Sequence, residues 1–492
     1  MNPILSRFEA TVAAFPNKRA VACGDEAFTF AELRLLAACL GTAIGPAPGA
    51  VGVLVHRSAV TAALFFGALY AGGCYVPLDP DMPEHKLQTI LNDAEIRVLL
   101  GAREDLPLLE RVGFTGCFLT PEDAGEIPVP APEAGPDTPL YMVYTSGSTG
   151  KPKGVRKSHG AMCSFIDAFR ETFSVTDREI IGNQNPFFFD AAAKDLYLMA
   201  CTGATLEVIP SEKFIFPVRL IEYLNERRIS YICWVPTALA IVTQLNTFRQ
   251  VLPTTLEKVL FVGEVFPVKQ LHKWLETLPD LRYVNLYGSS ELAGICCYYE
   301  IPRGVLPEQL PMGKPLSNCR VYLRGEDGFV TQPGQLGEVW VESPALALEY
   351  FGDPEKTAAT FCEEVLPDGR VARVLKTGDL ARYDGEGNLV FSSRKDFQIK
   401  HMGRRIELGE IEAAADALPE LARCCCLYND QKKRIELFCQ LTEGAELDGK
   451  AVQSLLRGRL SDYMLPSKVH ILPALPINPN GKINRTALKE QM

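Results

Sequence analysis

The sequence predicts an α/β protein in which a large N-terminal domain holds mostly parallel sheets covered by helices, followed by a smaller α/β domain. Two observations lead to this prediction. Short apolar runs alternate with helical patterns along most of the chain, and after Asp396 the pattern of short strands and helices becomes that of a small, separate α/β unit. Parallel strands need a crossover that brings the chain back to the same end of the sheet, and a helix is the usual crossover. The alternation therefore predicts parallel strands with helices on the faces of their sheets.

The alternation begins near the N-terminus, where two apolar runs typical of buried strands, 50–55 (AVGVLV) and 74–78 (CYVPL), flank a helical pattern at 58–73. A second series alternates strand, helix, strand, helix and strand at residues 230–235, 237–248, 258–263, 267–278 and 282–288. Ligands bind such sheets beyond the carboxyl ends of the strands. The Pro-rich residues 128–139 are predicted to be a linker or surface loop.

We expect the chain to divide into a large domain, residues 1–395, and a small domain, residues 396–492. The small domain holds 14 Lys and Arg against 13 Asp and Glu, whereas the whole chain holds 50 against 60. The small domain therefore has a net charge of +1 and the large domain a net charge of −11. An acidic partner would be repelled less by the small domain than by the large one.

The composition excludes several classes of protein. A net charge of −10 over 492 residues argues against nucleic acid or an anionic membrane as the main partner. The N-terminal residues lack the apolar core of a signal peptide, and no run approaches the roughly 18 apolar residues of a membrane-spanning helix. We therefore expect a cytoplasmic protein. The 15 cysteines show no CxxC pair and no zinc-binding spacing, so we expect them to be reduced and mostly buried.

Residues 144–154, YTSGSTGKPKG, have the composition of an anion-binding loop. Glycines let the backbone approach an anion closely, while hydroxyl and backbone N–H groups donate hydrogen bonds to it. A Walker P-loop is excluded, because position 145 is Thr instead of Gly and Pro152 follows Lys151. We predict a turn between two strands, 140–144 and 154–159. On composition alone, a flexible surface turn without a ligand remains open.

Four further stretches follow in order: NLYGSSE (285–291), KTGDLARYDGEG (376–387), SRKDFQIKHMGRRIELGEIE (393–412) and LPINPNGKINRTAL (475–488). With the glycine-rich loop they resemble the signature set of the adenylate-forming superfamily. This superfamily comprises acyl- and aryl-CoA ligases, firefly luciferase and the adenylation domains of nonribosomal peptide synthetases. The resemblance covers nearly the whole chain and includes an early motif of the peptide-synthetase branch, GALYAGGCYVPLDPDMP. It implies the adenylate-forming enzyme fold, in which the small C-terminal domain is mobile.

The resemblance implies a two-step reaction that uses ATP and Mg²⁺. A substrate carboxylate attacks the α-phosphate of ATP, which gives an acyl-AMP and pyrophosphate, and a phosphopantetheine thiol then takes the acyl group as a thioester. The length of the chain and its FVGEVFP segment resemble stand-alone ligases such as D-alanine–carrier protein ligase. Because ten residues follow Lys482, we expect the carrier to be a separate protein. An acyl- or aryl-CoA ligase that uses free CoA and an inactive adenylate-binding regulator remain as alternatives.

The resemblance assigns the β- and γ-phosphates of ATP to the glycine-rich loop, at Thr145, Ser146, Gly147, Ser148, Thr149, Gly150 and Lys151. It also implies that Thr149, Glu291 and Lys482 are catalytic. Preorganised donors of this kind stabilise the charge that develops on a pyrophosphate leaving group.

The same resemblance places the rest of the nucleotide on Asn285, Tyr287, Gly288, Ser290, Asp379 and Arg394. The Tyr287 ring would pack on adenine, Ser290 would donate to the α-phosphate, and Asp379 would accept from the ribose hydroxyls. Glu291 would bind Mg²⁺, which prefers carboxylate and phosphate oxygens. Ser289, Ser290 and Ser393 stand where many members of the family have Pro, Thr and Gly.

In the C-terminal part, Asp396 matches the hinge of the family. Rotation about this residue would bring two faces of the small domain into one site in turn. One face carries Lys482, which would neutralise charge during adenylation. The other carries Gly403, beside which the pantetheine arm would pass, because a glycine leaves room for a ligand next to the backbone.

Asp190 favours an amino acid as the substrate. In relatives that activate amino acids, an Asp after Phe at this place pairs with the substrate ammonium, and an unpaired buried ammonium would cost several kcal/mol. An alternative is that Asp190 only caps the helix that begins there. Alignment to the specificity positions of the family gives a side-chain pocket of Ala191, Lys194, Cys233, Leu260, Val262, Leu286, Gly294 and Ile295.

Lys194 departs from the apolar residue that D-alanine ligases have at this position. A helical lysine normally extends to water, and an inward Lys194 would favour an acidic or polar substrate side chain. Its neighbour Asp195 is an awkward partner, because adjacent helical residues diverge by about 100°. An outward Lys194 leaves a small amino acid as the expected substrate.

Because the acceptor thiol belongs to the carrier, we predict that no cysteine of this chain takes part in the chemistry. Mass spectrometry of the protein incubated with ATP and substrate, without carrier, should show no acyl group on any of the 15 cysteines. A stable thioester on one of them would contradict this prediction.

Overall fold

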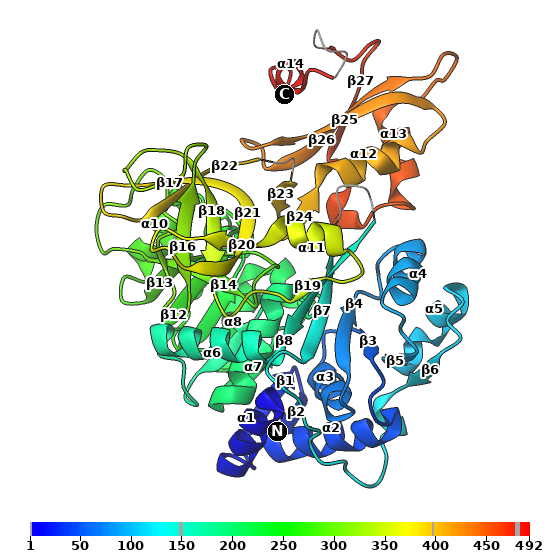
Figure 1. Ribbon diagram of the computed structural model, residues 1–492, viewed down its shortest axis with the longest axis vertical. Coiled ribbons are helices and arrows are strands. Elements are labelled where there is room, and N and C mark those ends of the chain that lie inside the picture. The colour runs from blue at the N-terminus through cyan, green and yellow to red at the C-terminus, as the bar shows by residue number, and fades with distance from the viewer. Residues whose placement is uncertain (1, 147–150, 396–397, 478–482) are drawn as a thin grey trace. The chain divides into compact units, whose positions relative to one another are not determined.

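The structure is a computed structural model that describes residues 2–146, 151–395, 398–477 and 483–492 (Figure 1). The chain falls into two compact units. The first unit comprises Met1–Pro80, Ile90–Tyr144 and Gly154–Lys395, and the second comprises Asp81–Thr89, Thr145–Lys153 and Asp396–Met492. These units differ from the expected domains, 1–395 and 396–492, by the two short segments that join the second unit, and the expected domains remain a prediction.

A nine-stranded sheet forms the centre of the first unit. Its six middle strands are parallel, and antiparallel strands extend both edges. In order across the sheet the strands are β15 (Lys314–Pro315), β14 (Ile295–Glu300), β13 (Arg282–Gly288), β12 (Lys258–Val262), β11 (Tyr231–Trp234), β9 (Ile180–Asn183), β10 (Thr205–Val208), β1 (Arg19–Cys23) and β2 (Glu26–Thr29). The expected strands at 230–235, 258–263 and 282–288 are confirmed, and each is mostly buried.

A seven-stranded sheet holds the two strands that flank the glycine-rich loop. In order its strands are β19 (Glu349–Tyr350), β8 (Lys153–Ser158), β7 (Pro139–Thr145), β4 (Cys74–Leu78), β3 (Ala50–Leu54), β5 (Val98–Leu100) and β6 (Cys117–Leu119). Figure 1 shows β7, β8 and β19 side by side. The two strands predicted to flank the loop are therefore confirmed as β7 and β8, which are neighbours in the sheet.

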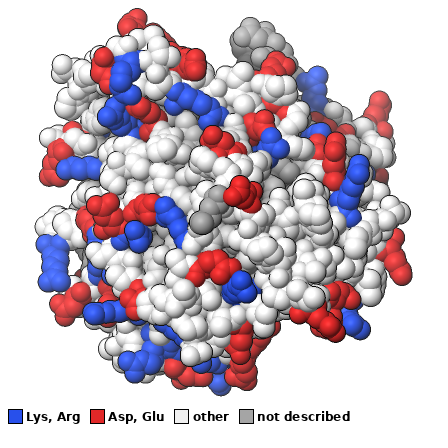
Figure 2. Space-filling view, turned by 60° about the horizontal axis from the view of Figure 1, so that its bottom comes forward, with Lys and Arg blue, Asp and Glu red and all other residues white. Residues whose placement is uncertain are grey.

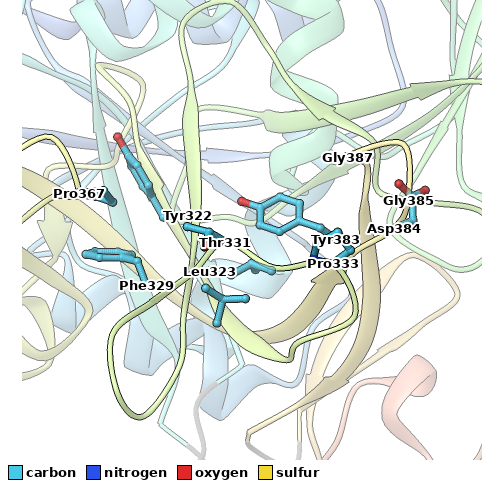
Figure 3. Close-up of a pocket in the computed structure, with 11 residues that line it drawn as sticks. Tyr322, Leu323, Phe329, Thr331, Pro333, Pro367, Tyr383, Asp384, Gly385 and Gly387 are labelled. Carbon is cyan, nitrogen blue, oxygen red and sulfur yellow. The ribbon is translucent and has the colours of Figure 1, made fainter.

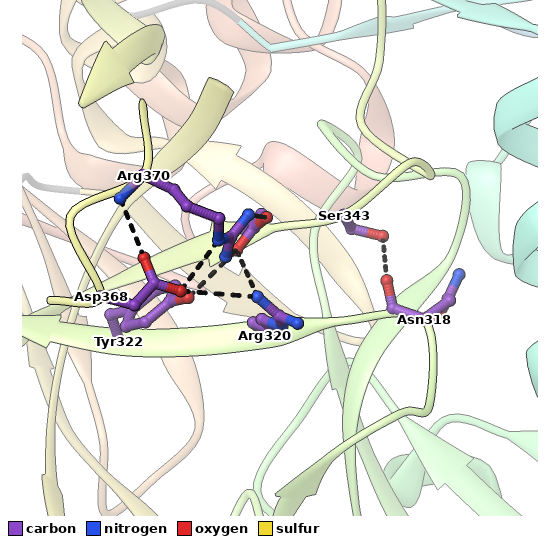
Figure 4. Close-up of polar contacts among 7 residues, drawn as sticks. Asn318, Arg320, Tyr322, Ser343, Asp368 and Arg370 are labelled. Atoms are coloured by element: carbon purple, nitrogen blue, oxygen red, sulfur yellow. Dashed lines mark hydrogen bonds and ion pairs between the residues drawn. The ribbon is translucent and has the colours of Figure 1, made fainter. Parts of the chain in front are cut away.

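A third sheet is antiparallel, which the sequence analysis did not anticipate. Its strands are β17 (Phe329–Val330), β16 (Arg320–Arg324), β18 (Gly337–Glu342), β21 (Val371–Tyr383), β20 (Phe361–Val365) and β22 (Leu389–Arg394), which pairs with β21. A network of arginines and acids on this sheet links Arg320, Asp368 and Arg370 to Glu342 (Figure 4). The arginines are half exposed, and ion pairs of this kind add little to stability.

Helices cover the parallel sheets. Those of the first unit are α1 (Pro3–Ala14), α2 (Phe30–Ile44), α3 (Val60–Tyr70), α5 (Leu106–Arg111), α6 (His159–Phe173), α7 (Asp190–Thr202), α8 (Pro217–Glu226), α9 (Pro236–Gln244), α10 (Val268–Thr277) and α11 (Pro354–Thr360). Helix α4 (Glu84–Asp93) has residues in both units. A capping box of Thr29 and Glu32 starts α2, and α3 is apolar all round because it is buried on nearly every side.

The second unit contains a three-stranded sheet of β25 (Leu421–Asn429), β26 (Arg434–Leu441) and β27 (Lys468–Ile471), together with the hairpin of β23 (Gln398–His401) and β24 (Arg404–Glu407). Its helices are α12 (Leu408–Asp416), α13 (Gly449–Arg457) and α14 (Arg485–Lys489). The two residues of the hairpin turn, Met402 and Gly403, have φ of +52° and +74°. This is the combination that a tight hairpin turn requires, so Gly403 has a structural reason to be glycine.

The predicted α/β class is confirmed. Among the described residues, no helix is both long and apolar enough to cross a membrane. On the face drawn in Figure 2, acidic and basic side chains are interspersed.

Candidate active site

Strands β11, β12 and β13 are neighbours and run parallel, so their carboxyl ends lie at one edge of the nine-stranded sheet. Most of the predicted pocket residues belong to these strands or to the start of β14. In the ladder, Cys233 lies opposite Leu260 and Val262 lies opposite Leu286. The described structure thus brings the predicted positions together where such sheets bind ligands.

Packing closes this region tightly. Cys233, Leu260, Leu286 and Ile295 are buried members of the main hydrophobic core, and Val262 packs against it. A Cβ added to Gly294 would lie 2.2 Å from the Phe165 ring, so only glycine fits there without rearrangement. Ala191, on the first turn of α7, is half-buried.

The residues predicted to bind the nucleoside also meet. Asp379 on β21 lies opposite Arg394 on β22 in the ladder, and its carboxylate forms an ion pair with the Arg394 guanidinium. The Tyr287 hydroxyl, from the end of β13, donates a hydrogen bond to the same carboxylate. Burial and the charge of Asp379 raise the pKa of Tyr287, which keeps its hydroxyl protonated as a donor. The Asn285 amide, by contrast, donates to the backbone carbonyl of Pro311 at 2.7 Å.

Glu291, predicted to bind Mg²⁺, is buried just beyond β13. Its Oε1 accepts a hydrogen bond of 2.5 Å from the Tyr350 hydroxyl, which fixes the orientation of the carboxylate. Ser290 and Gly288 lie beside it and are partly exposed. Among the described residues, no group of three or more His, Cys, Asp or Glu could hold a metal by itself.

Asp190 begins helix α7 but does not cap it through its side chain, since α7 has no side-chain cap bond. The carboxylate instead forms a buried ion pair with Lys157 of β8. The Tyr141 hydroxyl of β7 donates to it at 2.9 Å. Burial raises the pKa of Asp190 and lowers the pKa of Lys157, so each charge depends on the other for compensation.

Lys157 is the functional candidate that the sequence analysis missed. Its side chain is 0% exposed. Successive strand residues point to opposite faces, so Lys157 shares a face with Val155, whose side chain is fully buried. The two-residue spacing from the apolar Val155 is the one signal in the sequence that places Lys157 on the buried face of the strand.

Lys194 does not extend to water, contrary to the behaviour expected of a helical lysine. It is 5% exposed and pairs with Asp195, the neighbour considered an awkward partner. The pair forms because Asp195 is held by the Asn183 amide at 3.0 Å, and the Lys194 ammonium lies 5.5 Å from the centre of the Tyr231 ring. Burial lowers the pKa of Lys194, but Asp195 and Cys233 together more than offset this, and the pKa is raised overall.

Other predicted residues lie outside the described part of the chain: Gly147, Ser148, Thr149, Gly150, Asp396 and Lys482. Of the remaining loop residues, Ser146 donates to the Arg405 carbonyl at 3.0 Å and accepts from the Glu407 backbone N–H at 3.3 Å, within the second unit. Thr145 ends β7, and Lys151 is exposed. The cysteines in described positions are all free thiols, and burial raises the pKa of Cys233 to about 11, which makes it a poor nucleophile.

A separate groove of about 530 Å³ lies on the antiparallel sheet (Figure 3). Tyr322, Phe329 and Tyr383 line it together with prolines and glycines, and none of the predicted site residues does. Because none of those residues lines the groove, we do not assign the predicted chemistry to it.

Tyr287, Asp379 and Arg394 thus lie in contact, as their predicted shared role in binding a nucleoside requires. The model of the AMP-binding enzyme family matches residues 8–351, and that of the AMP-binding enzyme C-terminal domain matches residues 410–482. The chain belongs to the AMP-binding enzyme family.

Two curated relatives match over nearly their whole length. L-proline–[L-prolyl-carrier protein] ligase of Pseudomonas fluorescens is 31% identical over 100% of both chains, and D-alanine–D-alanyl carrier protein ligase of Bacillus cytotoxicus is 28% identical over 99% of both chains. The solved structure of holo-PA1221, a peptide-synthetase protein with adenylation and PCP domains, superposes with a TM-score of 0.87 and 22% identity, covering 99% of this chain and 84% of that one. The chain spans only 7% to 44% of several other curated relatives, at 29–30% identity.

The Lys194–Asp195 pair leads to a prediction about stability. Lys194→Met leaves Asp195 buried without its cation, and we expect the free energy of unfolding to fall by about 3 kcal/mol. Denaturant unfolding measures this loss. The double variant Lys194→Met/Asp195→Asn, which removes both charges, should recover most of it. Equal stability of the native protein and Lys194→Met would show that the pair does not form.

Proposed function

We propose that the protein activates an amino acid as aminoacyl-AMP, with release of pyrophosphate, and transfers it to the phosphopantetheine thiol of a separate carrier protein. The observation that carries this proposal is the Asp190 carboxylate at the start of α7, the helix that follows the carboxyl end of β9 along the chain. An ammonium group brought into this buried region needs an anionic partner. The two full-length relatives, both named as ligases of an amino acid and a carrier protein, support the proposal.

In the first step, an oxygen of the substrate carboxylate forms a bond to the α-phosphorus of ATP, and the bond from this phosphorus to the pyrophosphate breaks. Tyr287, Asp379 and Arg394 would hold the nucleoside, with the Asp379 carboxylate as acceptor for the ribose hydroxyls. Glu291, fixed by Tyr350, would bind Mg²⁺ together with phosphate oxygens, since these are the ligands that this ion prefers. Lys482 would neutralise charge between the carboxylate and the phosphate.

The pocket favours a small or uncharged amino acid side chain. Its strand residues are apolar or small, and the Lys194 charge is matched within the protein by Asp195. A substrate with a carboxylate side chain would have to compete with Asp195 for this lysine. We therefore propose alanine, serine or a similar amino acid in preference to aspartate or glutamate.

Pyrophosphate release over a panel of D- and L-amino acids, with acetate, propionate and benzoate as controls, tests the function. We expect an amino acid to be the best substrate. Asp190→Asn, which keeps the shape of the side chain but removes its charge, should lower kcat/KM for that amino acid by about 100-fold, equivalent to roughly 3 kcal/mol. Preferred turnover of a simple acid would favour the acyl- or aryl-CoA ligase alternative instead.

The two C-terminal motifs should separate the half-reactions. Lys482→Ala is expected to abolish formation of aminoacyl-AMP and to leave thioester formation from supplied aminoacyl-AMP largely intact. Gly403→Leu is expected to do the reverse, because a side chain there would obstruct the thiol. Gly403→Asn controls for the turn, since Asn tolerates a positive φ better than Leu. If Lys482→Ala and Gly403→Leu impaired the same step equally, this would refute the mechanism in which the small domain rotates to bring two different faces into the site.

A further inference from the structure

Lys157 is a fully buried lysine attached to the carboxylate that the proposed function assigns to the substrate. It lies on β8, and its ammonium donates to Oδ1 of Asp190. The same ammonium lies 5.1 Å from the centre of the Tyr141 ring, whose hydroxyl also donates to Oδ1. Two donors of the protein therefore converge on one oxygen of Asp190.

The other oxygen of Asp190 remains available. Oδ2 accepts no hydrogen bond from the part of the chain that the structure describes, and the Asp190 side chain is 14% exposed whereas Lys157 is 0% exposed. The protein thus holds the carboxylate from its buried side and leaves an accessible oxygen. A substrate ammonium and Lys157 can bind the same carboxylate at the same time, through different oxygens.

The charges around this carboxylate come from several elements. Glu291, beyond β13, attracts Lys157 and repels Asp190. The phenols of Tyr75 on β4 and Tyr197 on α7 are hydrogen-bonded to each other at 2.9 Å and stay neutral, since burial raises the pKa of both. Lys157 is thus the cation that offsets Asp190 before any substrate arrives.

We propose that Lys157 is a positioning residue that limits how strongly this chain prefers an amino acid over the same acid without its amino group. The inference rests on the proposed function, in which Asp190 binds the substrate ammonium. Two cations that share one carboxylate repel each other, and in a buried site this repulsion is screened little. Lys157 therefore weakens the attraction of Asp190 for the ammonium and leaves an acid without an amino group unaffected.

Lys194 cannot play this part. Its ammonium pairs with Asp195, whose other oxygen is held by Asn183, so that this group of charges is balanced within the protein. Lys157, by contrast, pairs with a carboxylate whose other oxygen, Oδ2 of Asp190, is accessible to a substrate ammonium. Specificity is a difference between two affinities, and a repulsive element acts on only one of them.

The test compares the best amino acid from the panel with the acid of the same skeleton that lacks the amino group, such as alanine with propionate. The measured quantity is the ratio of their kcat/KM values in pyrophosphate release. Lys157→Met removes the competing cation, and we expect the ratio to rise at least tenfold, mainly through a lower KM for the amino acid. Lys157→Gln keeps a hydrogen-bond donor for Asp190 but removes the charge, so it should also raise the ratio. It replaces Lys157→Met in the test if the Met variant folds poorly.

Two controls accompany this test. Lys258 also forms a buried ion pair, with Glu179 at 2.7 Å, but it lies at the amino end of β12, away from the strand ends of the site. Lys258→Met should therefore leave the ratio unchanged. The double variant Lys157→Met/Asp190→Asn has no carboxylate for an ammonium, and its ratio should fall below that of the native protein.

A ratio that stays within twofold of the native value, or that falls, in both Lys157→Met and Lys157→Gln would overturn the inference. These outcomes are distinct from failure of the proposed function, which would appear in the native protein as a lack of turnover with every amino acid. As a readout that needs no turnover, the rise in Tm produced by the amino acid should be larger for a Lys157 variant than for the native protein. An equal or smaller rise would also count against the inference.

Discussion

The ion pair between Lys157 and Asp190 is the constraint on which the site depends, because it joins two sheets that the chain builds separately. Lys157 comes from β8 of the seven-stranded sheet, and Asp190 begins α7, which packs on the nine-stranded sheet. A carboxylate and an ammonium with little access to water are tolerated only as partners. The pair therefore keeps a charged carboxylate beside the strand ends, where an otherwise apolar core would exclude it.

Other buried charges of the first unit are also compensated by partners within the protein. Asp379 is neutralised by Arg394 and receives a hydrogen bond from Tyr287, while Lys194 is neutralised by Asp195. Each of these carboxylates is thus paired with a cation and held in place before a ligand arrives. Preorganised charge of this kind is what the transfer of a phosphoryl-linked group requires, since no reorganisation is then needed as charge develops.

Much of the fold was predictable from local patterns. The parallel strands of the nine-stranded sheet are short buried runs between helices, and this pattern is legible in the sequence. The antiparallel sheet around β21 escaped prediction, because strands such as β16 and β21 bury only a few of their residues and most of its strands have no helix between them. The motifs predicted one nucleotide-binding role for Tyr287, Asp379 and Arg394; the three side chains are in contact, and their role stays a prediction. The partners of Asp190 and Lys194 were not predictable, because Lys157 pairs across sheets and Asp195 depends on how Asn183 holds it.

The central claim is that a carboxylate of the substrate attacks the α-phosphate of ATP. Oxygen tracing tests it most directly. The native protein is incubated with ATP, the best amino acid labelled with ¹⁸O in its carboxylate, and hydroxylamine, which attacks the acyl carbon and releases AMP. The account predicts AMP that carries one ¹⁸O atom, because the oxygen that joined the phosphorus stays with it. Unlabelled AMP, or ADP with the label in inorganic phosphate, would contradict the account.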